Sequence, residues 1–178
     1  MTSGMSRSEV EALLSKRPNS SYGKASQFDV LGTRAVGVAC NLDEEDPLLI
    51  DPCKRDPINE LLWDFSTELT LVEPKMGVTG YSQYGAYTIR TCALNRAELV
   101  LDRIPTVRTL RVIRTHILNR LGAWGGDALE LSDILAEVDT LSSFAQPDQP
   151  YAGMATAFIA DFQLELDRWR DANGLPPF

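Results

Sequence analysis

Residues 106–121, TVRTLRVIRTHILNRL, constrain the fold more than any other stretch, because their apolar positions recur with a helical period. Steps of three or four residues separate these positions, which are Val107, Leu110, Ile113, Ile117 and Leu121. This spacing places them on one side of an α-helix. Pro105 stands just before the run, so the helix is predicted to begin after this proline.

The same run is rich in β-branched residues, which favour strands, so a strand is the alternative interpretation. A strand would place Arg108, Arg114 and His116 on one face together with apolar side chains such as Leu118. Because that face would mix charged and apolar groups, the helix is favoured over the strand.

Charge is segregated along the sequence. Residues 90–120 hold seven arginines against only Glu98 and Asp102. Residues 1–89 hold 8 basic and 13 acidic side chains, residues 121–178 hold 2 and 10, and the whole chain has a net charge of -8. A basic band therefore interrupts an acidic protein. Since binding phosphates requires positive charge, the overall balance argues against nucleic acid as a direct ligand.

The length of 178 residues and the apolar fraction of 44% are sufficient for one globular domain over residues 1–178. No apolar run approaches the roughly 20 residues needed to cross a membrane. The first residues also lack the apolar segment of a secretory signal. We therefore expect no membrane partner, no secretion, and a location in the cytoplasm or in a particle assembled there.

The pattern of the remaining chain predicts an α+β fold, an α-rich single domain with five or six helices and a small antiparallel sheet. Ser6 and Glu9 have the spacing of a capping box, which predicts an N-terminal helix over residues 7–17. A sheet-containing part is expected over residues 28–93 and a helical part over residues 94–172.

Within the sheet-containing part, strands are expected inside residues 28–40, over 68–72 and over 86–93. A tyrosine-rich loop would join the last two strands. Asp56-Pro57 is typical of a helix start, and the apolar spacing that follows is helical.

The helical part is expected to contain three helices besides the central run. A short helix is predicted over 95–103, a second from Asp127, which has Glu130 three residues later, and a last one over 151–172. The apolar stripe of the second consists of Leu131, Ile134, Leu135, Val138 and Leu141, and that of the last consists of Met154, Phe158, Phe162, Leu166 and Trp169.

Two charged stripes are candidate docking surfaces. The arginine stripe consists of Arg108, Arg111 and Arg114, and the acidic stripe consists of Glu130, Asp133 and Glu137. Guanidinium groups pair bidentately with carboxylates and phosphates, whereas the simpler interpretation is a solvated helix face. The acidic stripe offers a partner of opposite sign, either within the chain or on a neighbouring copy.

Tyr81, Tyr84 and Tyr87 lie in the sequence GYSQYGAY. Tyrosine set among glycine, serine and glutamine is the composition of adaptable binding loops, so these three residues are candidate interface residues. The alternative is that their rings cover the edge of the sheet.

Catalytic and metal-binding patterns are weak. His116, the only histidine, lacks a flanking motif for a Cys–His pair with Cys40, Cys53 or Cys92, and the cysteine spacing predicts reduced thiols. The acidic run 43–46 does not have the spacing of an EF-hand loop. GAWGGD, residues 122–127, resembles a glycine-rich phosphate loop but lacks the following Lys-Ser/Thr. The sequence therefore predicts no catalytic residue, no metal site and no cofactor.

Segregated charge, a tyrosine-rich loop and the lack of a catalytic motif predict a non-enzymatic structural or assembly subunit of a larger, homo-oligomeric complex. Its protein partners would be copies of itself. Small α+β subunits of phage neck and tail-completion rings have this general character, so a virion component is one form of the prediction.

Two alternatives stay open. The acidic C-terminal third could make the protein a binding module or inhibitor of a basic, nucleic-acid-handling partner. An enzyme could also assemble its site from scattered residues such as Asp64, Glu68 and His116.

Overall fold

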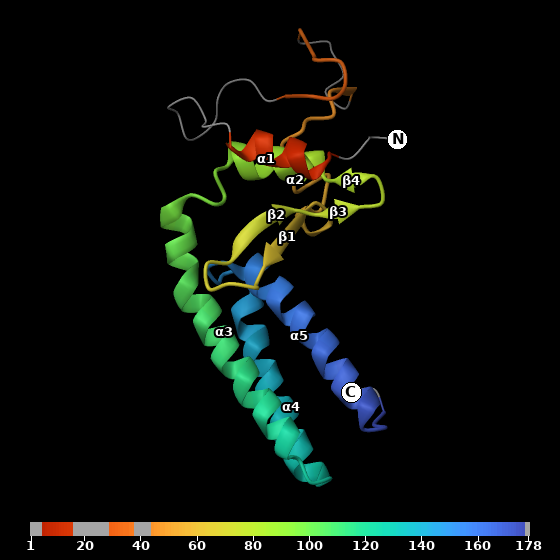
Figure 1. Ribbon diagram of the computed structural model, residues 1–178, viewed down its shortest axis with the longest axis vertical. Helices are drawn as coiled ribbons and strands as arrows, with labels where there is room; N and C mark the ends of the chain where they lie inside the picture. Colours follow the sequence, from red (N-terminus) through yellow and green to blue (C-terminus); the bar gives the residue numbers. More distant parts are fainter. Residues whose placement is uncertain (1–4, 16–28, 38–43, 177–178) are drawn as a thin grey trace. The chain divides into compact units, whose positions relative to one another are not determined.

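The computed structural model describes residues 5–15, 29–37 and 44–176 (Figure 1). The described helices are α1 (Arg7–Ser15), α2 (Gln83–Thr91), α3 (Ala97–Ala123), α4 (Ala128–Ser142) and α5 (Ala152–Ala172), with the short 3-10 helices η2 (Pro57–Asn59) and η3 (Ser143–Ala145). The strands are β1 (Leu61–Asp64), β2 (Leu71–Pro74), β3 (Met76–Gly77) and β4 (Gly80–Tyr81). The α-rich α+β prediction is confirmed, with two antiparallel two-stranded sheets in place of one.

The chain divides into two compact units. Unit 1 comprises Met1–Asp64 and Leu71–Val100, and unit 2 comprises Phe65–Thr70 and Leu101–Phe178. The segment between β1 and β2 therefore belongs to a different unit from the two strands that it joins. The prediction of one domain stays a prediction.

Unit 2 is built on the apolar faces of α3, α4 and α5. Its buried cluster consists of Leu110, Ile117, Leu121, Ile134, Leu141, Ala155, Phe158, Phe162 and Leu166. The helices predicted from Asp127 and over 151–172 are confirmed as α4 and α5. Asp127 caps α4 by accepting hydrogen bonds from the backbone N–H groups of Leu129 (2.8 Å) and Glu130 (3.0 Å).

The central run is helical, which excludes the strand alternative, but the prediction that a helix begins after Pro105 is wrong. Helix α3 is continuous from Ala97 to Ala123 with Pro105 inside it. Proline removes the N–H that would bond the carbonyl group four residues earlier, here Leu101. Pro105 and Leu101 are both exposed, so water can solvate the released carbonyl group, and the helix continues.

Two elements of unit 1 differ from the predicted ones. Asp56 caps a helix as expected, accepting from the N–H of Ile58 at 3.0 Å, but the helix is the single turn η2, and the chain then enters β1. β1 pairs with β2, with Trp63 opposite Val72. The predicted strand over 86–93 is wrong, because residues 83–91 form α2. Ser82 starts this helix by accepting from the N–H of Gly85 at 2.9 Å.

The N-terminal helix predicted over 7–17 is confirmed for Arg7–Ser15. Its capping box is reciprocal: Ser6 N donates to Glu9 Oε2 at 2.7 Å, and Glu9 N donates to Ser6 Oγ at 3.3 Å. Helix α1 lies along α2 within unit 1 (Figure 1). The strand prediction inside 28–40 falls partly outside the described residues, and residues 29–37 contribute one isolated bridge, from Val30 to Pro47.

Candidate functional site

The arginine stripe of α3 finds acceptors within unit 2. Arg108 pairs with Glu68 at 2.8 Å, and Arg111 Nη2 donates to two backbone oxygens, those of Phe65 and Thr67, each at 2.6 Å. The Arg108 guanidinium lowers the pKa of Glu68 below its usual value by hydrogen bonding and charge. These contacts hold the 65–70 segment against α3.

Arg114 makes a bidentate pair with a carboxylate of α5. Its Nε and Nη2 atoms donate to Glu165 Oε2 at 2.8 Å and Oε1 at 2.7 Å. The Glu165 hydrogen bond raises the pKa of Arg114, and burial opposes this rise. The three arginines therefore join segments of this chain, and their role at an interface between copies stays a prediction.

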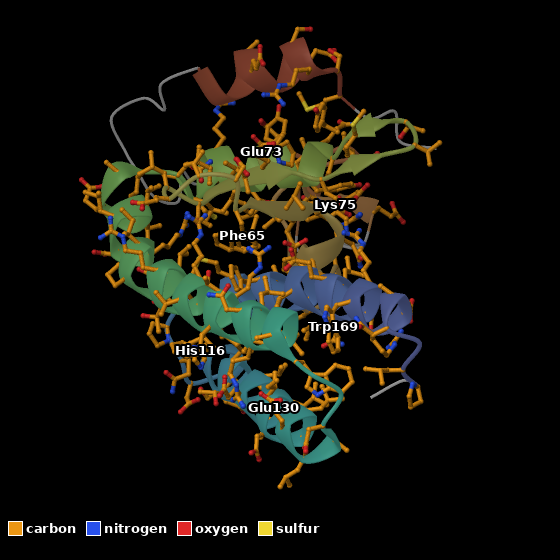
Figure 2. All side chains as sticks on the ribbon, turned by 60° about the horizontal axis from the view of Figure 1, so that its bottom comes forward. Phe65, Glu73, Lys75, His116, Glu130 and Trp169 are labelled. Atoms are coloured by element: carbon orange, nitrogen blue, oxygen red, sulfur yellow. The ribbon has the colours of Figure 1, made fainter. Side chains whose placement is uncertain are left out.

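The acidic stripe of α4 is only partly matched by cations. Glu137 forms an ion pair with Arg120, and the Nε2 atom of His116 lies 3.4 Å from its Oε2. Glu130 and Asp133 are exposed and have no cationic partner within the described part of the chain. Figure 2 shows Glu130 on α4.

The tyrosines do not lie in a projecting loop. Tyr81 belongs to β4, whereas Tyr84 and Tyr87 lie in α2. Tyr84 is buried, and its hydroxyl donates to Asp46 Oδ2 at 2.7 Å while the Arg55 guanidinium lies 3.6 Å from its ring centre. Burial, and next the Asp46 hydrogen bond, raise the pKa of Tyr84. Tyr84 thus belongs to the core of unit 1 together with Leu48 and Ile50.

The weaker candidates are not brought together. His116 is exposed, and its Nε2 atom lies 3.4 Å from the Glu137 carboxylate. Cys53 and Cys92 are free thiols, while Cys40 lies outside the described residues, as does Asp43. Within residues 5–15, 29–37 and 44–176, no group of three or more His, Cys, Asp or Glu side chains is placed to hold a metal ion.

The glycine-rich turn before α4 has an internal role in unit 2. Trp124 donates its indole N–H to the Asp127 carbonyl at 2.7 Å and packs edge-on against Trp169, with ring centres 5.6 Å apart. The Asp127 side chain accepts hydrogen bonds from the N–H groups at the start of α4, which are the groups that a phosphate-binding loop would offer to its ligand.

A cavity at the β3–β4 hairpin is the feature that sequence reasoning missed. Its volume is about 300 Å³. Its walls come from η2, the hairpin and the start of α2, and are formed by Arg55, Asn59, Glu60, Lys75, Met76, Gly77, Thr79, Gly80, Tyr81, Ser82, Gln83 and Tyr84. All of these residues belong to unit 1.

The polar wall of this cavity is held by a network around Glu60. Its carboxylate accepts from Arg55 Nη1 at 3.2 Å and from the Ser82 hydroxyl. The Glu60 carbonyl group accepts from Lys75 N at 2.8 Å. A Cβ added to Gly85 would lie 2.2 Å from the same carbonyl oxygen, so only glycine allows α2 to approach this closely.

The outer part of the hairpin is apolar and exposed. Met76 is 68% exposed, and Val78, at the turn, is 107% exposed. The turn joining β3 and β4 stands out from the rest of unit 1 (Figure 1). The sequence signal was the pair Gly77 and Gly80, because glycines close together mark a turn, although Val78 and Thr79 between them are not usual turn residues.

One edge of the hairpin is covered and the other is open. Tyr81 exchanges two backbone hydrogen bonds with Met5, at 2.9 and 2.8 Å, which covers β4. Met76 stands opposite Tyr81, and in an antiparallel pair of this register its N–H and C=O point away from β4. Within the described residues no hydrogen bond satisfies these two groups.

Lys75 lies at the base of the hairpin (Figure 2). Its Nζ donates to the Ile58 carbonyl at 3.1 Å, and none of the described carboxylates forms an ion pair with it. The hairpin therefore presents a positive charge beside two exposed apolar side chains, a cavity and a free strand edge.

Comparison of the chain with protein-family models, with curated proteins and with solved structures found no match. Among the helices of the described segments, none combines the length and the apolar content that a membrane span requires.

Proposed function

We propose that the protein is a non-enzymatic assembly subunit of a homo-oligomeric complex and that the β3–β4 hairpin is its docking surface. The observation that supports this proposal is the joint exposure of Met76 and Val78 beside a cavity of about 300 Å³. Single exposed apolar residues are normal on protein surfaces, but apolar groups gathered beside a hollow are typical of interaction sites.

The hairpin is a better candidate than the arginine stripe. Arg108, Arg111 and Arg114 already donate to acceptors of their own chain. A partner would have to break these contacts before it could bind the guanidinium groups. The Met76 backbone, in contrast, is available without a rearrangement, and the Lys75 ammonium group, which gives one hydrogen bond to the Ile58 carbonyl, keeps two N–H donors and makes no ion pair among the described residues.

The base of the hairpin is held by backbone hydrogen bonds on both sides, which favours binding. Lys75 is bonded on both sides, with its N–H on the Glu60 carbonyl at 2.8 Å and its C=O on Ser82 N at 2.9 Å. A surface held in its bound conformation loses little conformational entropy on association. The hairpin can therefore act as a preorganised docking element, with the turn residue Val78 at its tip.

The test is the mass of the full chain in solution over a range of concentrations. We expect the wild type to exceed the monomer mass of 19.7 kDa, and M76S/V78S to remain at 19.7 kDa. L164S is the matched control, because Leu164 is 56% exposed but lies on α5. Unchanged thermal unfolding of both variants would show that the substitutions leave the fold intact.

A wild type that stays monomeric at every concentration would contradict the proposal. So would an M76S/V78S variant that associates as strongly as L164S. A closed ring, as in the phage-type interpretation, would appear as one defined mass, and an open filament as masses that grow with concentration.

A further inference from the structure

We infer that the hairpin of one copy docks onto the solvent-facing side of α4 in a second copy, with Lys75 against Glu130 and Asp133. This inference rests on the proposed function and names its partner surface. The contact lies between two different copies of the chain.

The solvent-facing side of α4 combines apolar and acidic groups. Helical spacing aligns Leu129 with Asp133, Ala136 and Thr140, and all four are exposed. Leu129 is 74% exposed, whereas Ile134 and Leu141 on the opposite side are fully buried. A large apolar side chain thus stands in the first turn of α4 with carboxylates beside it.

The two surfaces are complementary in charge. Helix α4, ALELSDILAEVDTLS, contains no lysine or arginine. Glu130 and Asp133 make no ion pair within the described residues, and Lys75 of the hairpin makes none either. The arginines that could have matched these carboxylates are occupied, with Arg108 on Glu68 and Arg114 on Glu165. Attraction between unmatched charges favours this pairing and this orientation.

Two other exposed apolar positions of unit 2 have a basic neighbour on the same helix. Leu164 on α5 has Arg168 four residues later, and that exposed cation would repel Lys75. Val112 on α3 has Arg108 four residues earlier. Leu101 on α3 also has acidic neighbours, Glu98 and Asp102, but α4 places an exposed leucine on a helix that contains no basic residue.

This contact is heterologous, because the hairpin and the α4 surface are different patches. Each copy offers one of each, so association adds copies until a ring closes or a filament grows. Glu130 and Asp133 of the acidic stripe thus bind Lys75 of a second copy. The arginine stripe instead bonds acceptors of its own chain.

Charge reversal followed by mixing tests the contact. K75E and E130K/D133K, each alone, are expected to self-associate at least about tenfold more weakly than the wild type, because like charges would face each other. In an equal mixture, Lys75 of the E130K/D133K variant can bind the acidic α4 of the K75E variant. The acidic hairpin of the K75E variant can likewise bind the basic α4 of E130K/D133K. We expect the mixture to recover association to within about threefold of the wild type.

R96E is the matched control for K75E, since Arg96 is an exposed cation of unit 1 outside the hairpin. Acidic groups stabilise the first turn of a helix, so E130K could weaken α4 itself. D133K/A136K leaves that first turn unchanged and serves as the second acidic-face variant. Sedimentation velocity measures the association, and circular dichroism melts measure the fold.

Recovery on mixing would support an intermolecular contact, because a contact inside one chain cannot be restored by a second chain. A mixture that stays monomeric, or a K75E variant that associates like R96E, would overturn this inference. If M76S/V78S dissociates while the charge variants behave like R96E, the docking hairpin stands and only its partner is wrong. A monomeric wild type would overturn the proposed function and this inference together.

Discussion

The two units are stabilised in different ways. Unit 2 buries nine apolar residues between three helices, and its charged contacts lie around that cluster. Unit 1 has small apolar clusters, and polar contacts between residues far apart in the sequence hold it together. Tyr84 bonds Asp46 and Ser82 bonds Glu60, across 38 and 22 positions respectively.

This difference explains where a docking surface can arise. A long helix with one buried face satisfies its own backbone, whereas a short strand leaves an edge unless another strand pairs with it. Asn95 shows how unit 1 closes one such edge. Its amide group donates to the Val72 carbonyl and accepts from the Val72 N–H, both at 2.8 Å. The edge of β3 at Met76 has no equivalent contact among the described residues.

The largest effect is expected in the apolar core of unit 2. Phe162 is 1% exposed in the cluster, so Phe162→Ala should lower the free energy of unfolding by about 3–5 kcal/mol. Leu164→Ala, on the same helix but 56% exposed, should change it by less than about 0.5 kcal/mol. Urea denaturation followed by tryptophan fluorescence measures both. Similar losses for the two variants would contradict the burial of Phe162 in the apolar cluster that stabilises unit 2.

The next largest effect on stability is expected where α2 lies close to the Glu60 carbonyl group in unit 1. Gly85→Ala should destabilise the protein by about 1–3 kcal/mol, because the new Cβ would lie 2.2 Å from the Glu60 carbonyl oxygen. Gly122→Ala in α3 meets no atom within 4 Å and should stabilise the helix by up to about 1 kcal/mol. Thermal unfolding monitored by circular dichroism compares the two. A stabilising Gly85→Ala would show that the Glu60 contact does not constrain α2.

The smallest effect tests the polar anchoring of unit 1. Tyr84→Phe removes the hydroxyl that bonds Asp46 and should lower the free energy of unfolding by about 1–2 kcal/mol at neutral pH. The pKa of Tyr84 is raised above 10.0 in the folded protein, mainly by burial. Above pH 10 the unfolded chain loses this proton first, so the stability of the wild type falls as the pH rises.

Phenylalanine has no proton to lose, so the stability difference between the wild type and Tyr84→Phe should shrink above pH 10. Urea denaturation at several pH values measures this difference. Tyr151→Phe is the control, since the Tyr151 hydroxyl makes no hydrogen bond within the described residues. A difference that stays constant with pH would mean that the Tyr84 environment does not favour the neutral phenol.

Local patterns predicted α4, α5, the helical state of residues 106–121 and the N-terminal cap, but they divided α3 into two helices at Pro105. The capping box of Ser6 and Glu9, the Asp127 cap and the apolar spacing of α5 all depend on residues within a few positions of one another. The same reasoning failed at β1 and α2. Leu61 and Leu62 have helical spacing, yet these residues pair with β2, because β2 supplies hydrogen bonds that a local pattern cannot reveal.

The candidate site shows the same limit. Sequence reasoning selected the two charged stripes, but it could not find that Arg111 bonds the 65–70 backbone or that Glu130 has no cationic partner among the described residues. It grouped Tyr84 with Tyr81 as surface residues, whereas Tyr84 is buried beneath Arg55. Exposure and pairing depend on residues more than twenty positions away.

By itself the sequence determined the α-rich class, helices α4 and α5, three helix caps and the segregation of charge, because backbone hydrogen bonds within a helix span only four residues. Only the tertiary structure decided which arginines are occupied, which tyrosine is buried and that Met76 and Val78 remain exposed. These outcomes depend on which distant segment supplies an acceptor or covers a surface, and many distant segments offer the same chemistry.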